Sequence, residues 1–323
     1  MFFSLKIRKH LVLMCLLLNI CTHTKSQIDF DIILRQPSQL EFYTSALAHD
    51  SMQGRATGTE GMVKAAEFIA KQMKAIGLQP VKTNDGFFQR YGKLSHWDKY
   101  EAINVIGAIP GTVKPDEMVI FSAHYDHLGK TKSKKDSVYN GANDNASGTA
   151  LLLQLAAYFI QTKPERTVLF IAFSGEELGM KGSEEFTYTL DEDKVRAVIN
   201  FDMVGRSDKK RIYLSGSEYG DVRTVLNNQL YNYNKEKFGK SYFSRNAPIV
   251  DFFKRSDNYP FALKGIPAHT VSATPDSDRY YHQLTDEIST LDFDLMYDLA
   301  KTMFIAVQPV VNGTIKLKRI KVD

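Results

Sequence analysis

The stretch Phe170–Gly182 reads F-I-A-F-S-G-E-E-L-G-M-K-G and joins a predicted core strand to two carboxylates. Val168–Phe173 is an unbroken apolar run, typical of a strand that is buried on both faces of a sheet. Glu176 and Glu177 follow it closely, and neighbouring side chains at a strand end point in different directions. Burying two like charges is costly unless a cation or a proton compensates them. A Glu-Glu pair usually lies in a solvated turn, but this position between a core strand and a Gly-rich turn favours a metal site.

The first 26 residues have the pattern of a secretory signal peptide. Lys6, Arg8 and Lys9 form a basic segment, and the mainly apolar run Leu11–Ile20 follows it. Thr24–Ser26 places small residues at the positions that a signal peptidase reads. Ten residues are too few to span a bilayer, so a retained membrane span is not expected. The sequence therefore predicts a secreted or periplasmic protein.

Removal of this segment changes the cysteine count and the net charge. Cys15 and Cys21 are the only two cysteines, so the mature chain has no disulfide, no thiolate ligand and no cysteine nucleophile. A lipid anchor on Cys21 is less favoured, because Ile20 before it is bulky. The segment carries four cations and no acid, so the formal charge of +4 falls to zero and nucleic acid is not an expected partner.

The remaining residues, 27–323, are expected to form a single α/β domain. The chain is 43% hydrophobic and 24% charged, which is ordinary for a globular protein. Apolar runs alternate with segments of helical periodicity, which favours a mainly parallel mixed sheet covered by helices on both faces. The predicted strands are 104–109, 118–123, 167–173, 196–201, 211–214 and 266–272. The predicted helices are 37–48, 60–77, 146–160, 184–190, 221–233, 259–264 and 291–307.

Several metal-type side chains follow these predicted strands. Three of these sites lie at or just after the end of a predicted strand: His124, the Glu176–Glu177 pair and Asp202. In parallel sheets, ligand sites lie outside the carboxyl ends of the strands. Nitrogen and oxygen donors of the kind that catalytic zinc accepts are His124, Asp144, Glu177, Asp202 and His282. Asp126 and Asp286 are placed to orient the imidazoles of His124 and His282.

The motifs around these donors resemble those of the M28 family of co-catalytic zinc aminopeptidases. They are A-H-Y-D-H-L-G (123–129), G-A-N-D-N-A-S-G (141–148), S-G-E-E-L-G-M-K-G-S (174–183), N-F-D-M-V-G (200–205), R-S-D-N-Y-P-F (255–261) and Y-H-Q-L-T-D (281–286). They occur in the family's order and span most of the mature chain. One motif alone is weak evidence, but together they are highly specific.

The resemblance implies a role for each matched residue. Asp144 would bridge two zinc ions, with His124 and Asp202 completing one site and Glu177 and His282 the other. Glu176 would be the general base, and Tyr281 matches a tyrosine that polarises the scissile carbonyl in some members. Asp257 matches a residue of structural role, and Asn258 stands where the family often has histidine.

Formal charge agrees with this division. Three ligand carboxylates against two Zn²⁺ leave a charge of +1, which a hydroxide between the ions brings to zero. Glu176 is then free to accept a proton from a water whose pKa the metal lowers to about 7. The predicted function is a secreted two-zinc metallo-aminopeptidase that acts on peptides with a free N-terminus.

Three other functions stay open from the sequence. One is a glutaminyl-cyclase-like acyltransferase with a single zinc, and another is a dipeptidase or carboxypeptidase of the same family. The third is a non-catalytic binding module, which the intact set of ligands and base disfavours.

His127 and His269 are expected to be structural, and Lys130–Lys135 a solvated loop. The walls of the specificity pocket are expected within residues 241–253 and 274–280.

Overall fold

The computed structural model describes residues 32–35, 38–81, 85–96, 98–132, 136–208, 211–244, 252–275 and 277–322. The chain divides into two compact units, residues 1–37 and 38–323. The predicted signal peptide, residues 1–26, lies outside the described residues, so its prediction stands untested. Among the residues that are described, no helix has the length and apolar character needed to cross a membrane.

The unit 38–323 is built on a nine-stranded mixed sheet within its described residues. The strand order is β1-β3-β5-β4-β6-β9-β7-β8, and β2 pairs with β3. Strands β5, β4, β6 and β9 are parallel to one another, whereas β3 and β7 run antiparallel to their neighbours at either side. The bounds are β1 Gln79–Pro80, β2 Phe88–Arg90, β3 Ile103–Ile109, β4 Lys114–His124, β5 Arg166–Phe173, β6 Val195–Phe201, β7 Ile212–Leu214, β8 Phe243–Ser244 and β9 Ala268–Ser272.

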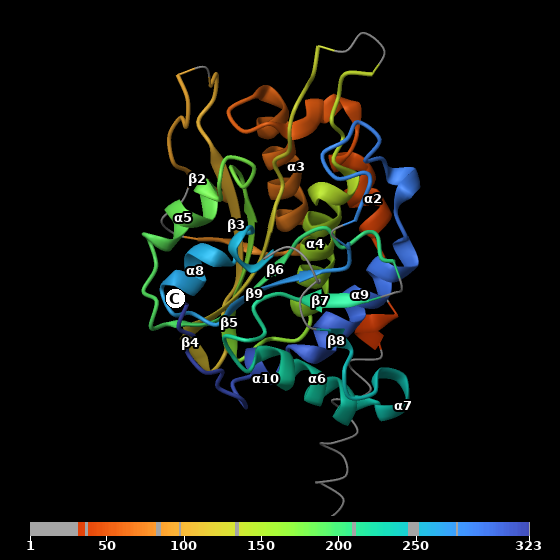
Figure 1. The fold of residues 1–323 in the computed structure, drawn as a ribbon. Helices are drawn as coiled ribbons and strands as arrows, with labels where there is room; N and C mark the ends of the chain where they lie inside the picture. Colours follow the sequence, from red (N-terminus) through yellow and green to blue (C-terminus); the bar gives the residue numbers. More distant parts are fainter. Residues whose placement is uncertain are drawn as a thin grey trace, which may run out of the picture. The chain divides into compact units, whose positions relative to one another are not determined.

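Helices cover both faces of this sheet (Figure 1). On one face, α3 contacts β3, and α4 contacts β4, β5 and β6. On the other face, α8 contacts β9 and packs against α5. The bounds are α2 Leu40–Leu47, α3 Glu60–Ile76, α4 Gly148–Phe159, α5 Lys181–Thr187, α6 Val222–Tyr233, α7 Lys235–Phe238, α8 Tyr259–Leu263, α9 Phe293–Ala306 and α10 Gln308–Val311. The predicted fold class is confirmed.

The two faces of the sheet have separate aromatic cores, because alternate residues of a strand point to opposite faces. Phe121 of β4 and Phe170 of β5 pack against Phe159 of α4. Phe173 of β5 packs on the opposite side against Phe186 of α5 and Phe261 of α8. The central strands are thus buried on both faces, as their unbroken apolar runs predict.

Local signals explain the ends of two long helices. The Thr59 side chain accepts a hydrogen bond from Met62 N at the start of α3, and Gly77 ends that helix in the left-handed conformation. Asp292 caps α9 by accepting a bond from Leu295 N. The predicted helix 146–160 is preceded by an irregular turn, Ala142–Ser147, so regular helix starts only at Gly148.

Candidate metal centre and active site

The parallel strands bring the predicted donors to one edge of the sheet. His124 is the last residue of β4, Asp202 directly follows β6, and Glu176 and Glu177 follow β5. Asp144 lies in the turn Ala142–Ser147 ahead of α4, and His282 lies in the connection between β9 and α9.

The donor atoms form two groups that could each hold a metal ion. The inner group consists of His124, Asp144 and Asp202; the outer group consists of His127, Asp144, Glu177 and His282. Within each group, the donor atoms lie within 4.8 Å of one another. The five residues that the sequence named as ligands lie in these groups: His124 and Asp202 in the inner group, Glu177 and His282 in the outer group, and Asp144 in both.

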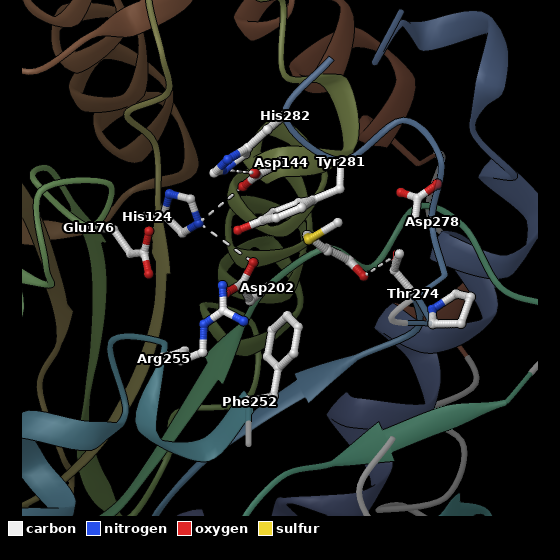
Figure 2. Close-up of a pocket in the computed structure, with 12 residues that line it drawn as sticks. His124, Asp144, Glu176, Asp202, Phe252, Arg255, Thr274, Asp278, Tyr281 and His282 are labelled. Carbon is white, nitrogen blue, oxygen red and sulfur yellow. Dashed lines mark hydrogen bonds and ion pairs between the residues drawn. The ribbon is translucent and has the colours of Figure 1, made fainter. Parts of the chain in front are cut away.

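Asp144 belongs to both groups and turns one oxygen toward each. Its Oδ1 lies 3.4 Å from His124 Nε2, and its Oδ2 lies 3.2 Å from His282 Nε2. Figure 2 shows the carboxylate between the two imidazoles. Ligands of one zinc at bond lengths of about 2.0–2.2 Å stand about 3.4 Å apart when the geometry is tetrahedral. The spacing therefore suits a carboxylate that bridges two ions.

The backbone on both sides of Asp144 is anchored. Asp286 accepts hydrogen bonds from the main-chain N–H groups of Asn143 (3.0 Å) and Asp144 (3.0 Å), and Arg206 Nη1 donates to it at 2.7 Å. The next residue, Asn145, donates to Phe201 O of β6 at 2.9 Å, and the Asp144–Asn145 peptide bond is cis. The turn that carries Asp144 is thus tied to the strand that precedes Asp202.

These contacts change the role expected for Asp286. The sequence placed it beside His282, four residues earlier, as an orienting group. Its hydrogen bonds go instead to Asn143, Asp144 and Arg206, because the loop returns over the turn that carries Asp144. Asp286 supports the centre through the turn that carries Asp144 rather than through His282.

The inner group is held by hydrogen bonds on the sides that face away from a metal. His124 Nε2 lies 3.5 Å from Asp202 Oδ1, and Ser256 Oγ donates to the other oxygen, Oδ2, at 2.6 Å. His124 Nδ1 lies 3.2 Å from the main-chain oxygen of Asp126 and 3.7 Å from its carboxylate. Asp126 thus lies beside His124, as the sequence predicted. The only sequence signal for Ser256 is its place in the R-S-D-N motif.

In the same motif, the two residues after Ser256 have structural partners. Asp257 accepts a hydrogen bond from Ser183 Oγ at 2.6 Å, and burial raises its pKa to about 7. Asn258 accepts from Thr270 Oγ1 at 2.7 Å and donates to Phe253 O at 3.1 Å. The asparagine that replaces the family's frequent histidine is therefore fully engaged below the site.

The outer group contains one histidine that the sequence did not place among the metal donors. His127 was expected to be structural, but its Nδ1 lies 2.9 Å from Glu177 Oε1 and 3.7 Å from Asp144 Oδ2. Glu177 Oε2 lies 3.2 Å from His282 Nε2. Burial alone would raise the pKa of Glu177, but the hydrogen bonds with the two histidines outweigh it and hold this pKa far below its ordinary value. The sequence signal that could have identified His127 is the second histidine of H-Y-D-H (124–127).

Glu176 belongs to neither group but faces the same pocket as both. Its main-chain N–H donates to Asp126 Oδ1 at 3.2 Å, so Asp126 links it to His124. Thr57 supports this arrangement by donating to Asp126 Oδ2 and accepting from Gly175 N, both at 2.9 Å. The two adjacent glutamates are thus separated, one toward the pocket and one toward a metal group.

The pocket in front of the centre has apolar, acidic and basic walls (Figure 2). It is lined by His124, Asp144, Glu176, Asp202, Met203, Phe252, Arg255, Thr274, Pro275, Asp278, Tyr281 and His282. Phe252, Thr274, Pro275 and Asp278 come from the segments expected to form the walls. Met203 and Arg255 were not expected there. The Tyr281 ring stacks on His282 with ring centroids 3.9 Å apart, and its hydroxyl points into the pocket.

The electrostatics of the centre indicate a deficit of positive charge. Hydrogen bonds with Asp144 and Glu177 raise the pKa of His282 to about 10. Burial lowers the pKa of His124, but Glu176, Asp126 and Asp202 outweigh it and raise that pKa well above its ordinary value. Asp144 Oδ2 and His282 Nε2 are buried, and apart from the contacts within the outer group they have no hydrogen-bond partner among the described residues. Clustered carboxylates, imidazoles and unpartnered donor atoms fit a pair of divalent cations such as zinc.

Comparison with known proteins agrees with this geometry. Residues 104–307, more than half of the chain, match the model of Peptidase family M28. The chain belongs to this family. Its M28 match contains His124, Asp144, Glu176, Glu177, Asp202 and His282.

Curated relatives and solved structures are consistent with this membership. The chain is 28% identical to aminopeptidase YwaD of Bacillus subtilis over 237 residues, which cover 71% of this chain and 49% of YwaD. The chain spans less than two thirds of the length of the first curated relatives that it matches.

Two solved structures share the fold. The Legionella pneumophila LapA aminopeptidase has a TM-score of 0.69 at 18% identity, covering 88% of this chain and 75% of LapA. A Bacteroides thetaiotaomicron glutaminyl cyclase has a TM-score of 0.65 at 19% identity, covering 84% of this chain and 98% of the cyclase. Because the fold is shared by both activities, the donor set must discriminate between them.

Proposed function

We propose that this protein is a two-zinc aminopeptidase that removes N-terminal residues from peptides. The observation that carries the proposal is the position of Asp144, which offers one oxygen to each of two donor groups, while Glu176 lies beside both and in neither. His124, Asp144 and Asp202 would hold one ion, and Asp144, Glu177 and His282 the other. A single-zinc cyclase has no need of the complete inner group.

The division of labour between the two glutamates follows from their positions. The ions, when bound, supply Lewis-acid charge that polarises a peptide carbonyl and acidifies water. Glu176 lines the pocket without sharing either group, so its carboxylate is free to accept a proton from the attacking water and to pass it to the leaving amine. Its main-chain N–H donates to Asp126, whose carboxylate also lies 3.7 Å from His124 Nδ1, so Glu176 and His124 share one support.

Tyr281 is placed to act on the substrate carbonyl. Burial raises the pKa of its hydroxyl, and the charges of Asp144, Glu177 and Asp202 raise it further. The phenol therefore stays protonated at neutral pH and can donate a hydrogen bond to the oxygen that becomes negative in the transition state. Stacking on His282 fixes the ring.

An aminopeptidase must also bind a positive α-amine. Glu176 and Asp202 line the pocket and offer carboxyl oxygens to the amine, whereas Asp278 is paired with Arg206. Arg206 and Arg279, which flank the matched motifs, are engaged with Asp278 and Asp286 and with the Tyr280 hydroxyl. Arg255 lines the pocket, so the carboxypeptidase alternative has one candidate guanidinium and needs a direct test.

Four versions of one dipeptide provide that test: the free dipeptide, its N-acetyl form, its C-terminal amide and the doubly blocked form. The proposal predicts that acetylation removes most of the activity and that amidation changes it little. The reverse order would establish a carboxypeptidase. Equal rates on acetylated and free dipeptides would refute the aminopeptidase and leave the two-zinc hydrolase intact.

We also propose that the protein is exported and that residues 1–26 are removed. The basic segment and the apolar run Leu11–Ile20 support this. The intact mass of the protein recovered outside the cytoplasm tests it, since the mature chain should begin at Gln27. Recovery of the full-length chain only from the cytoplasm would overturn it.

A further inference from the structure

The outer group contains one nitrogen more than the resemblance to known family members requires. The His127 side chain is fully buried, and its Nδ1 lies 2.9 Å from Glu177 Oε1. Two roles are available to a histidine in this place. It can bind the ion directly, or it can donate a hydrogen bond to a carboxylate that binds the ion.

The distances within the outer group distinguish the two roles. His282 Nε2 stands 3.2 Å from Asp144 Oδ2 and 3.2 Å from Glu177 Oε2, close to the separation of about 3.4 Å expected of ligands that share a zinc. His127 is not equidistant: its Nδ1 lies 2.9 Å from Glu177 Oε1 and 3.7 Å from Asp144 Oδ2. The shorter distance is that of an N–H···O hydrogen bond. The two oxygens of Glu177 thus face different histidines.

The surroundings of His127 hold its ring in this position. Gly141 has a φ of +52°, and a Cβ there would stand 2.5 Å from His127 Cδ2 and 2.2 Å from Asp144 O. Arg55 is fully buried and donates to the main-chain oxygens of Tyr125 (2.7 Å), Asn140 (2.7 Å) and Gly141 (3.0 Å). Arg55 therefore connects the loop that carries His127 to the loop that begins the Asp144 turn.

We propose that His127 is the positioning residue of the outer metal group, and that its Nδ1–H holds Glu177 Oε1 so that Oε2 is presented to the ion. The proposal rests on the metal centre of the proposed function but not on its peptidase activity. Removing such a supporting residue typically costs about 10–100-fold in metal affinity. The loss should fall on one of the two ions, because His127 contacts Glu177 and approaches Asp144 at Oδ2, the oxygen turned toward the outer group.

Two substitutions separate this role from packing and from direct ligation. In His127→Asn, the amide nitrogen stands where Nδ1 stands, so the hydrogen bond is kept although volume is lost. In His127→Leu, volume is kept although the donor is lost. A matched control is His269→Leu: His269 is also fully buried, and its Nε2 also lacks a partner among the described residues, but its Nδ1 contacts the main-chain oxygen of Ser215.

The measurement is the zinc affinity of the metal-free proteins, obtained by competition with a chromophoric chelator, with the melting temperature as a check of folding. We expect His127→Leu to lower the affinity for one of the two zinc ions by about 10–100-fold. In His127→Asn, that affinity should lie within a few-fold of the value for the unsubstituted protein. His269→Leu should lower the melting temperature and leave both affinities unchanged.

Two results would overturn the proposal. Unchanged affinity in both His127 variants would reduce the residue to packing, and abolition of the same zinc site in both would make it a direct ligand. If His127→Leu does not fold, His127→Gln replaces it, because its amide reaches the Nε2 position and leaves Nδ1 without a substitute. Zinc binding with the expected order but without peptide hydrolysis would refute the proposed function and leave this inference standing.

Discussion

The inner and outer metal groups share Asp144 but are built from different parts of the fold. The inner group takes His124 and Asp202 from the ends of the adjacent parallel strands β4 and β6, and their side chains are only 2% and 6% exposed. The outer group takes Glu177 and His282 from connections, and the His282 side chain is 32% exposed. One group is fixed by the sheet, and the other is completed by a loop.

This difference shows how a rigid edge and a loop can share one reaction centre. The sheet determines the positions of His124 and Asp202, since each strand is buried on both faces and cannot shift without disturbing the core. The loop that carries Tyr281 and His282 also forms a pocket wall, so substrate contacts and the outer group are joined in one segment. The inner ion is therefore expected to be the less exchangeable of the two.

The largest effect expected without the loss of either group comes from Glu176→Gln. Because Glu176 is outside both groups, the variant should keep both zinc ions and lose turnover by about 10²–10⁴-fold. Kinetics and metal analysis on the same sample check this. Loss of zinc from the variant would mean that the roles of Glu176 and Glu177 are reversed.

A smaller and reversible effect is expected from His282→Ala, which removes a ligand from the outer group alone. The affinity of the variant for one of its two zinc ions should fall by at least about 100-fold. Removing a direct ligand should weaken binding more than removing a residue that only supports a ligand. Part of the activity should return in excess zinc. His49→Ala is the control, because His49 is exposed and its side chain contacts Ser51. This variant should retain both zinc ions. Simultaneous loss of both ions from His282→Ala would contradict the separation of the two groups.

The sequence predicted the parts of this centre that depend on strand ends and on motifs. Apolar runs located β4, β5, β6 and β9, and the parallel arrangement followed from their alternation with helices. His124 and Asp202 needed only that topology to be brought together. Assignment of Asp144, Glu177 and His282 to particular ions came from the resemblance to M28 peptidases, because their relative positions depend on loops.

Contacts that depend on loop paths were not predictable in the same way. Asp286 lies four residues after His282, yet the chain folds back so that its carboxylate reaches Asn143 and Asp144. His127 lies next to Glu177 only because β4 and β5 are parallel neighbours in register. Arg255 enters the pocket from a segment with no helical or strand periodicity. The spacing of these residues along the sequence does not predict their distances in the folded protein.

Asp144 is proposed to bridge the two groups, and the zinc content of the protein and of its Asp144 variants tests this most directly. Native mass spectrometry of the unsubstituted protein should find two zinc ions per chain. Asp144→Ala, or Asp144→Asn if alanine prevents folding, should lose both together, because each group loses an oxygen donor. One zinc per unsubstituted chain, or an Asp144 variant that retains one ion with unchanged affinity, would contradict the bridge.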